Sequence, residues 1–298
     1  MGLKDTQQLS YVGYTGRHPY TTDAFSHGFL PGYREDGGYQ LDGLPNVDLP
    51  VGFLDNDFHD PDMDRYLDAF TRIEPSVAAV GDAYTEEQAK DMDEAVGQLR
   101  DDYPHNTFVV VPKCEEAFEI LDNDIVLGYA NGYSDIQAED LGLEKYRGRE
   151  VHILGSSPTQ QYKAIQQLTQ PNLRDDPPAN IKGVDWNGAH KGAYFGEYWS
   201  RNGWQPADHL SIRETVEESL KEVKAYWQDK GLWPETEPKD IYGGPYTEPD
   251  DPVFAASGRD IDSKEKLETS HIGEYDGNTY AFESATAKRF VEHREGLF

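Results

Sequence analysis

The sequence predicts an α/β fold, and within that class a (β/α)8 TIM-type barrel, from three observations. Short apolar segments of strand length alternate with amphipathic segments over residues 51–232, which is typical of parallel strands covered on both faces. No glycine-rich dinucleotide fingerprint follows any of these strands, which favours a barrel over an open doubly wound sheet. Three strands end at an aspartate, Asp55, Asp82 or Asp185, and the strand ends of a barrel meet at one rim.

Six strands are predicted from the apolar segments. They cover residues 51–55, 77–82, 107–111, 124–129, 150–154 and 180–185. The segment 107–111 contains only β-branched and aromatic residues, as a fully buried strand does. In the segment 62–73, apolar residues recur at helical spacing and predict a helix. A short helix that carries Phe118 and Leu121 is predicted after the strand 107–111. Three more helices are predicted at capping boxes, which are Thr85–Gln88, Ser157–Gln160 and Ser211–Glu214.

The chain divides into three parts by composition. Residues 1–50 are rich in Gly, Tyr, Pro and Asp without a sustained period, and predict an irregular N-terminal segment of loops with room for short strands. Residues 51–232 are the predicted barrel core that carries the active site. Residues 233–298 are rich in Pro and acidic residues and predict an extended C-terminal excursion that packs on the barrel through Tyr242 and Phe254. A short helix is expected near Ser284–Glu295.

The chain is strongly acidic, with 56 acidic and 27 basic residues among 298 and a net charge of −29. An evenly distributed acidic surface keeps a protein soluble in concentrated salt, so the composition resembles that of a halophilic protein; an ordinary acidic cytosolic protein is the alternative. Strong salt screens phosphate contacts, so this charge does not exclude a nucleic-acid partner. The single cysteine, Cys114, excludes an intrachain disulfide and a thiolate zinc site.

No apolar run reaches the ~18 residues of a membrane-spanning helix, and the first residues lack the apolar region of a signal peptide. The expectation is a soluble cytoplasmic protein without a membrane partner, or one of the host cytoplasm if it is viral. The sequence does not determine the oligomeric state.

Asp185 is the candidate nucleophile. It lies between Gly183 and Gly188, and glycine on both sides leaves room for a ligand to approach the carboxylate. A carboxylate can attack an anomeric carbon to form a covalent intermediate, and a second carboxylic acid must then move the protons. Asp55 is the candidate for that second role. A turn or helix-cap function is the alternative for Asp55 and for Asp82.

Other side chains near these aspartates have two interpretations. Phe58, Tyr84 and Trp186 each follow one of the aspartates closely and could stack on a planar base, or belong to the core. Lys191 and Arg201 could contact phosphates or form solvated ion pairs. His152 is interpreted as a core histidine rather than a catalyst.

A metal site is considered and not predicted. Five acidic and histidine residues crowd together at Asp55, Asp57, His59, Asp60 and Asp62, but no HxH or HExxH element accompanies them. Acidic surfaces produce such clusters by chance. No cofactor is predicted.

The order of segments resembles the tRNA-guanine transglycosylase superfamily, whose barrels exchange guanine for a 7-deazaguanine through a covalent aspartyl-sugar intermediate. The segments that carry the resemblance are Phe53-Leu-Asp55-Asn-Asp-Phe58-His59, Val80-Gly-Asp82-Ala-Tyr84, Gly128-Tyr-Ala-Asn-Gly132, His152-Ile-Leu-Gly155 and Gly183-Val-Asp185. The resemblance implies that Asp185 is the nucleophile and Asp55 the general acid/base. It also implies base contacts from Asp82, Gly132 and the Leu154–Gly155 segment.

The chain departs from this family at several positions. The Asp-Ser-Gly-Gly signature reads Asp-Asn-Asp-Phe after Leu54, and the Val-Gln-Gly segment that binds the base reads Val111-Pro-Lys113. The cysteine-rich zinc site and a basic RNA-binding domain are absent. The chain therefore resembles the divergent branch that inserts 7-deazaguanines into DNA, and the halophilic composition fits an archaeal virus or its host.

The expected function is the exchange of guanine in DNA for 7-cyano-7-deazaguanine or a relative, with RNA the less favoured substrate. A glycoside or nucleoside hydrolase on the same barrel is one alternative. The other is a non-catalytic viral accessory protein that binds nucleotide or a partner.

Overall fold

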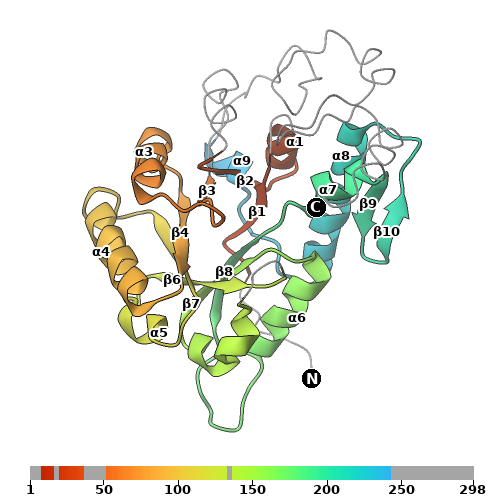
Figure 1. The fold of residues 1–298 in the computed structure, drawn as a ribbon. Helices are drawn as coiled ribbons and strands as arrows, with labels where there is room; N and C mark the ends of the chain where they lie inside the picture. The colour runs from red at the N-terminus through yellow and green to blue at the C-terminus, as the bar shows by residue number, and fades with distance from the viewer. Residues whose placement is uncertain (1–7, 17–19, 37–51, 133–135, 243–298) are drawn as a thin grey trace.

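The computed structural model describes residues 8–16, 20–36, 52–132 and 136–242, and it confirms the predicted fold class (Figure 1). Eight parallel strands form a closed barrel in the order β1 to β8. Their bounds are β1 Tyr11–Thr15, β2 Leu30–Arg34, β3 Phe53–Asp55, β4 Val77–Ala83, β5 Thr107–Pro112, β6 Val126–Ala130, β7 Glu150–Leu154 and β8 Asn180–Asp185. The six predicted strands are β3 to β8.

The barrel begins earlier than predicted. β1 and β2 lie inside residues 1–50, which were assigned to an irregular segment outside the core, and both strands belong to the ring. β8 pairs with β1 to close it, which sets Gly13 beside Asp185. The two strands escaped prediction because Gly13, Pro31 and Gly32 interrupt them, and glycine and proline usually indicate turns.

Helices cover the outside of the ring between the strands (Figure 1). Their bounds are α1 Tyr20–Ser26, α3 Met63–Ile73, α4 Glu86–Asp102, α5 Ala117–Ile120, α6 Pro158–Thr169, α7 Gly188–Tyr194, α8 Ile212–Asp229 and α9 Pro238–Tyr242. Two short 3-10 helices, η2 Ala138–Leu141 and η3 Leu143–Tyr146, connect β6 to β7. A hairpin of β9 Glu197–Ser200 and β10 Gly203–Pro206 packs beside α7 and α8.

The predicted helix starts are confirmed to different degrees. Ser211 and Glu214 form a complete capping box at the start of α8. At α4 only half of the box forms, because the Gln88 side chain accepts from Tyr84 N rather than from Thr85. The box predicted at Ser157 is wrong, since its hydroxyl bonds to Thr159 instead of capping α6.

The apolar residues form two clusters. The larger one fills the space between the strands and the helices and includes Leu54, Phe108 and Trp227. The smaller one alternates with it along the strands, as the lining of a barrel interior does. Its members are Tyr11, Leu30, Phe53, Val77, Ala79, Val109 and Val126, with Leu154 packed against them. The interior below the rim is therefore a packed core, and ligand chemistry is left to the strand ends.

The C-terminal part is described as far as residue 242. Trp233 is buried and donates to Glu237, and α9 follows. The predicted contact of Phe254 and the predicted helix near residues 284–295 lie outside the described residues, as does the side chain of Tyr242. Among the described residues, no helix is both long and apolar enough to cross a membrane.

A substitution at Gly183 on β8 tests how closely the barrel interior is packed. A Cβ atom there would overlap the ring of Tyr11, so Gly183→Ala should lower the free energy of unfolding by about 1–3 kcal/mol. Gly97 is the matched control, since it lies exposed in α4 with no atom within 4 Å of an added Cβ. Gly97→Ala should stabilise by about 0.5–1 kcal/mol. Denaturant titration measures both, and equal effects of the two substitutions would contradict the packing.

Candidate active site

The three predicted aspartates end strands of the same parallel ring. Asp55 ends β3, Asp82 lies near the end of β4 and Asp185 ends β8. All three therefore lie at the carboxyl rim of the barrel, where TIM-barrel enzymes carry their active sites. Burial raises the pKa of the Asp55 carboxyl, and the negative charges of Asp185 and, to a smaller extent, Asp82 add to the rise. Asp55 therefore lies within electrostatic reach of both other carboxylates.

Asp185 is buried and held at both carboxylate oxygens. His152 Nε2 lies 3.2 Å from Oδ1, and the Thr15 hydroxyl donates to Oδ2 at 3.3 Å. The backbone at Asp185 is fixed as well, since Gln161 Nε2 of α6 donates to its carbonyl oxygen at 2.6 Å. Residues of β1, β7 and α6 therefore hold Asp185 in place.

His152 is a core histidine, as the sequence suggested, and its polar partners join it to Asp185. It is completely buried, but both of its ring nitrogens have polar partners: Nε2 contacts Asp185, and Nδ1 lies 2.8 Å from the Tyr11 hydroxyl. Burial, and next the charge of Asp185, raise the pKa of Tyr11 well above its ordinary value, so the phenol keeps its proton. Tyr11, His152 and Asp185 therefore form a hydrogen-bonded chain inside the barrel.

Asp55 is in a different electrostatic environment. Burial raises its pKa well above the ordinary value, and the charge of Asp185 adds to this effect. Arg34, the cross-strand neighbour of Asp55 on β2, opposes the shift without cancelling it. Asp55 is thus poised to hold a proton beside a second carboxylate, which is the property of a general acid.

Asp82 is paired with a buried lysine. Lys113, whose side chain is 1% exposed, places Nζ 3.5 Å from Asp82 Oδ2 and donates to the carbonyl of Ile136 at 3.2 Å. Tyr84 donates to the same Asp82 oxygen at 3.4 Å, and its ring centre lies 5.9 Å from Nζ. Burial raises the pKa of Asp82, while Lys113 counteracts part of that rise. The pair presents a donor and an acceptor side by side.

Phe58 and Tyr84 are the exposed aromatic side chains of this rim, each 40% exposed. Phe58 stacks on His59 with ring centres 4.1 Å apart, and the Arg34 guanidinium lies 5.8 Å from its ring. Both are available to a planar ligand. Trp186, by contrast, is a core residue that packs edge-on against Trp199.

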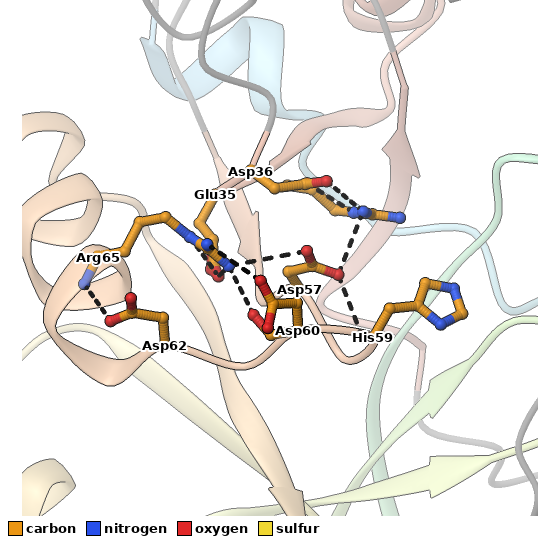
Figure 2. A network of polar contacts seen from close by, with 8 residues as sticks. Glu35, Asp36, Asp57, His59, Asp60, Asp62 and Arg65 are labelled. Atoms are coloured by element: carbon orange, nitrogen blue, oxygen red, sulfur yellow. Dashed lines mark hydrogen bonds and ion pairs between the residues drawn. The ribbon is translucent and has the colours of Figure 1, made fainter. Parts of the chain in front are cut away.

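The acidic residues after β2 and β3 are held by arginines (Figure 2). Arg65 of α3 contacts Glu35 at 2.9 Å and Asp57 at 3.7 Å, and it donates to the backbone of Asp60. Arg34 pairs with Asp36 and with Asp57. Among the described residues, no group of three or more His, Cys, Asp or Glu side chains could hold a metal ion. This network joins the β3–α3 loop to the end of β2.

The predicted base-contacting residues on β6 and β7 lie in two loops that touch. Gly132 has a φ of +115° and Gly155 one of +69°, both in the region that favours glycine. A Cβ on Gly132 would meet Ser156, and Leu154 packs against the interior cluster. Gln161 binds the Gly155 carbonyl as well as that of Asp185, which links the ends of β7 and β8.

Lys191 and Arg201 are exposed. Lys191 lies on α7, the helix that follows β8, and Arg201 lies in the turn between β9 and β10. Neither is part of the carboxylate group at the rim.

Sequence reasoning missed five polar residues of this site: Tyr11, Thr15, Arg34, Lys113 and His152. One signal could have found the strands of the first three. β1, β2 and β6 share a five-residue pattern with glycine third and tyrosine fourth, as the segments 11–15, 30–34 and 126–130 show. In each the glycine faces the lumen and the tyrosine is buried on the outer side. Nothing in the sequence pairs His152 with Asp185.

The raised pKa of Asp55 makes stability depend on pH in a defined direction. Between the ordinary pKa of an aspartate and the raised value, the folded state holds a proton that the unfolded chain has released. Stability therefore falls as pH rises through this window, by on the order of 1 kcal/mol per pH unit. Asp55→Asn removes this contribution. The free energy of unfolding of the wild type, minus that of the variant, should decline with pH, and parallel curves would contradict the assignment.

Solved structures resemble the chain only distantly. The YdjI aldolase from Escherichia coli K12 matches at 12% identity and a TM-score of 0.45, over 75% of this chain and 92% of the aldolase. Phosphoribosyl anthranilate isomerase from Thermococcus kodakaraensis matches at 12% and 0.41, and that from Thermus thermophilus at 14% and 0.40; each match covers 72% of this chain and 99% of the isomerase. Likeness at this level does not extend to activity.

No curated protein matches the chain. One family model does, that of the family of unknown function DUF6610, over residues 24–228. The match takes in the barrel from α1 to α8, including Asp55, Asp82, Lys113, His152 and Asp185. Since it spans more than half of the sequence, the chain belongs to the DUF6610 family.

Proposed function

We propose that this protein is a glycosyl-transferring enzyme that exchanges guanine in DNA for a 7-deazaguanine, such as 7-cyano-7-deazaguanine, through a covalent aspartyl-sugar intermediate. The observation that supports it is the unequal environment of two neighbouring carboxyl groups. Burial and charge favour the protonated form of Asp55, while Asp185 has a polar partner at each of its two oxygens. An acid and a nucleophile placed together are what double displacement at an anomeric carbon requires.

The reaction proceeds in two displacements. An Asp185 oxygen attacks C1′ of the deoxyriboside, the bond to guanine N9 breaks, and the departing base takes the bonding electrons and the proton of Asp55. Asp55, now ionised, removes the N9 proton of the incoming 7-deazaguanine. The incoming N9 then attacks C1′ and Asp185 leaves as a carboxylate. Bonds and protons balance without a cofactor, and water in place of the incoming base would give hydrolysis.

Asp82 and Lys113 are suited to read a 6-oxopurine. Guanine presents O6 as an acceptor next to the N1–H and N2–H donors, and an ammonium beside a carboxylate presents the complementary pattern. Adenine presents the reverse order at these atoms. Lys113 would thus replace the amide that the transglycosylase superfamily carries in its Val-Gln-Gly segment.

The remaining rim residues complete a binding surface for an extruded nucleotide. Phe58 or Tyr84 would stack on the base, and the loops at Gly132 and Leu154–Gly155 would place backbone against it. A base in duplex DNA must leave the stack to reach Asp185. Lys191 and Arg201 would contact the phosphates. An enzyme acting on cellular DNA in this way would work in the cytoplasm of the cell or, if viral, of its host.

The proposal is tested by exchange of bases in DNA. Purified protein in concentrated KCl, given a DNA duplex and labelled 7-cyano-7-deazaguanine, should place label in the deoxynucleosides of the digested DNA. Asp185→Ala should abolish incorporation, because no covalent intermediate can form. The control Asp68→Ala changes an exposed acid on α3 and should retain activity.

Three outcomes of this assay would reject the proposal. Incorporation that persists in Asp185→Ala would exclude the covalent mechanism. Release of guanine without incorporation would identify a hydrolase, and an unchanged DNA with wild-type protein would favour a non-catalytic role.

Lys113 provides a second test. Lys113→Met should lower kcat/KM for labelled guanine by about 10- to 100-fold, since a donor to the base is lost. Lys113→Gln keeps an N–H donor and should lose less. Lys90→Met, at an exposed position of α4, is the control for the loss of a positive charge. Equal rates for Lys113→Met and wild type, with folding verified by circular dichroism, would remove Lys113 from base recognition.

A further inference from the structure

His152 lies on the inside of the barrel beside two aromatic rings. The ring centres of Tyr11 and Phe53 are 5.5 and 5.3 Å from that of the imidazole, at interplanar angles of 21° and 27°. The two rings pack against the imidazole at small interplanar angles, and the polar contacts with Tyr11 and Asp185 hold its two nitrogens. A histidine needed only for packing does not require both constraints.

We propose that Tyr11 and His152 are positioning residues for Asp185: the Tyr11 hydroxyl donates to Nδ1 of His152, and the Nε2–H that remains donates to Oδ1 of Asp185. The inference rests on the proposed glycosyl transfer, in which Asp185 bonds to C1′. It adds to that reaction two residues that no part of the mechanism above uses.

The direction of the hydrogen bonds follows from the role of Asp185. As the nucleophile of the proposed reaction it is a carboxylate, which can only accept, so the hydrogen of the 3.2 Å contact is on Nε2 of His152. In the Nε2–H tautomer Nδ1 is an acceptor, and the Tyr11 hydroxyl, 2.8 Å away, donates to it. Thr15 supplies the hydrogen bond to the other carboxylate oxygen.

Two glycines leave room for the end residues of the hydrogen-bonded chain, Tyr11 and Asp185. A Cβ on Gly183 would overlap the Tyr11 ring, and one on Gly13 would lie 3.0 Å from Asp185 Cβ. Both glycines are on the paired strands β8 and β1 that close the barrel. The strand pairing that closes the ring therefore also places Tyr11 and Asp185.

The hydrogen bond from His152 acts on both displacements. It holds the carboxylate plane toward C1′ during attack, and it stabilises the negative charge that returns to Asp185 when the new base displaces it. Removing the donor should therefore slow turnover and leave more of the enzyme as the covalent adduct, with little change in KM for DNA.

Two substitutions at His152 separate positioning from packing. His152→Phe keeps an aromatic ring beside Tyr11 and Phe53 but has no donor, while His152→Gln keeps an N–H donor and loses the ring. We expect kcat for base exchange to fall about 100-fold in His152→Phe, and Gln to recover at least part of that loss. Higher activity for Phe than for Gln would overturn the proposal, because packing alone would then explain the residue.

Tyr11→Phe removes only the hydroxyl, so kcat should fall about 10-fold and the adduct should accumulate. The matched control is His105, which is exposed after α4; its Phe and Gln variants should both retain wild-type activity.

A measurement without turnover tests the same assignment. Long-range 1H–15N spectra of imidazole-labelled protein should show His152, identified by its loss in His152→Gln, as the Nε2–H tautomer in the wild type. That signal should change in Tyr11→Phe. The Nδ1–H tautomer or an imidazolium in the wild type would overturn the proposal. If wild-type protein exchanges no base, the proposed function fails, and this spectrum alone decides whether the Tyr11–His152–Asp185 chain exists.

Discussion

The pairing of β8 with β1 is the interaction on which the rest of the site depends. It joins the last strand of the barrel to the first across more than 160 residues of sequence, and it turns a row of strands into a ring with one carboxyl rim. The same pairing sets Gly13 beside Asp185 and Tyr11 beside Gly183. Without it, Asp185 would lose Thr15, and His152 would lose its tyrosine partner.

Burial of charge is the second constraint at this rim. A carboxyl group loses hydration when it enters a protein interior. This loss is compensated when the group pairs with a cation or accepts hydrogen bonds, and it is reduced when the group keeps its proton. The three aspartates use these responses differently: Asp82 pairs with Lys113, Asp185 accepts from Thr15 and contacts His152, and Asp55 shifts toward the protonated form. One rim thus contains three carboxyl groups with three different chemical properties. In a strongly acidic chain, the buried cation Lys113 lies beside Asp82 at this rim.

Local pattern was sufficient for the middle of the barrel and insufficient for its start. β3 to β8 are apolar runs of strand length between helices, so their burial was readable from composition. β1 and β2 contain Gly13, Pro31 and Gly32, which alone indicate turns; they are strands because neighbouring strands on both sides supply hydrogen bonds. The Ser157 cap failed for a similar reason, since a nearby hydroxyl competed for the side chain that was expected to cap the helix.

The sequence by itself determined the barrel class, six of its strands and the three aspartates at their ends, because hydrophobic periodicity and strand-end position are local properties. Only the tertiary structure decided which side chains share the rim. Tyr11, Arg34, Lys113 and His152 come from four different strand regions, and their partners lie far away along the chain. The tertiary structure also decided that Asp55 favours its protonated form. A pKa shift depends on distance and burial, and neither exists until the ring has closed.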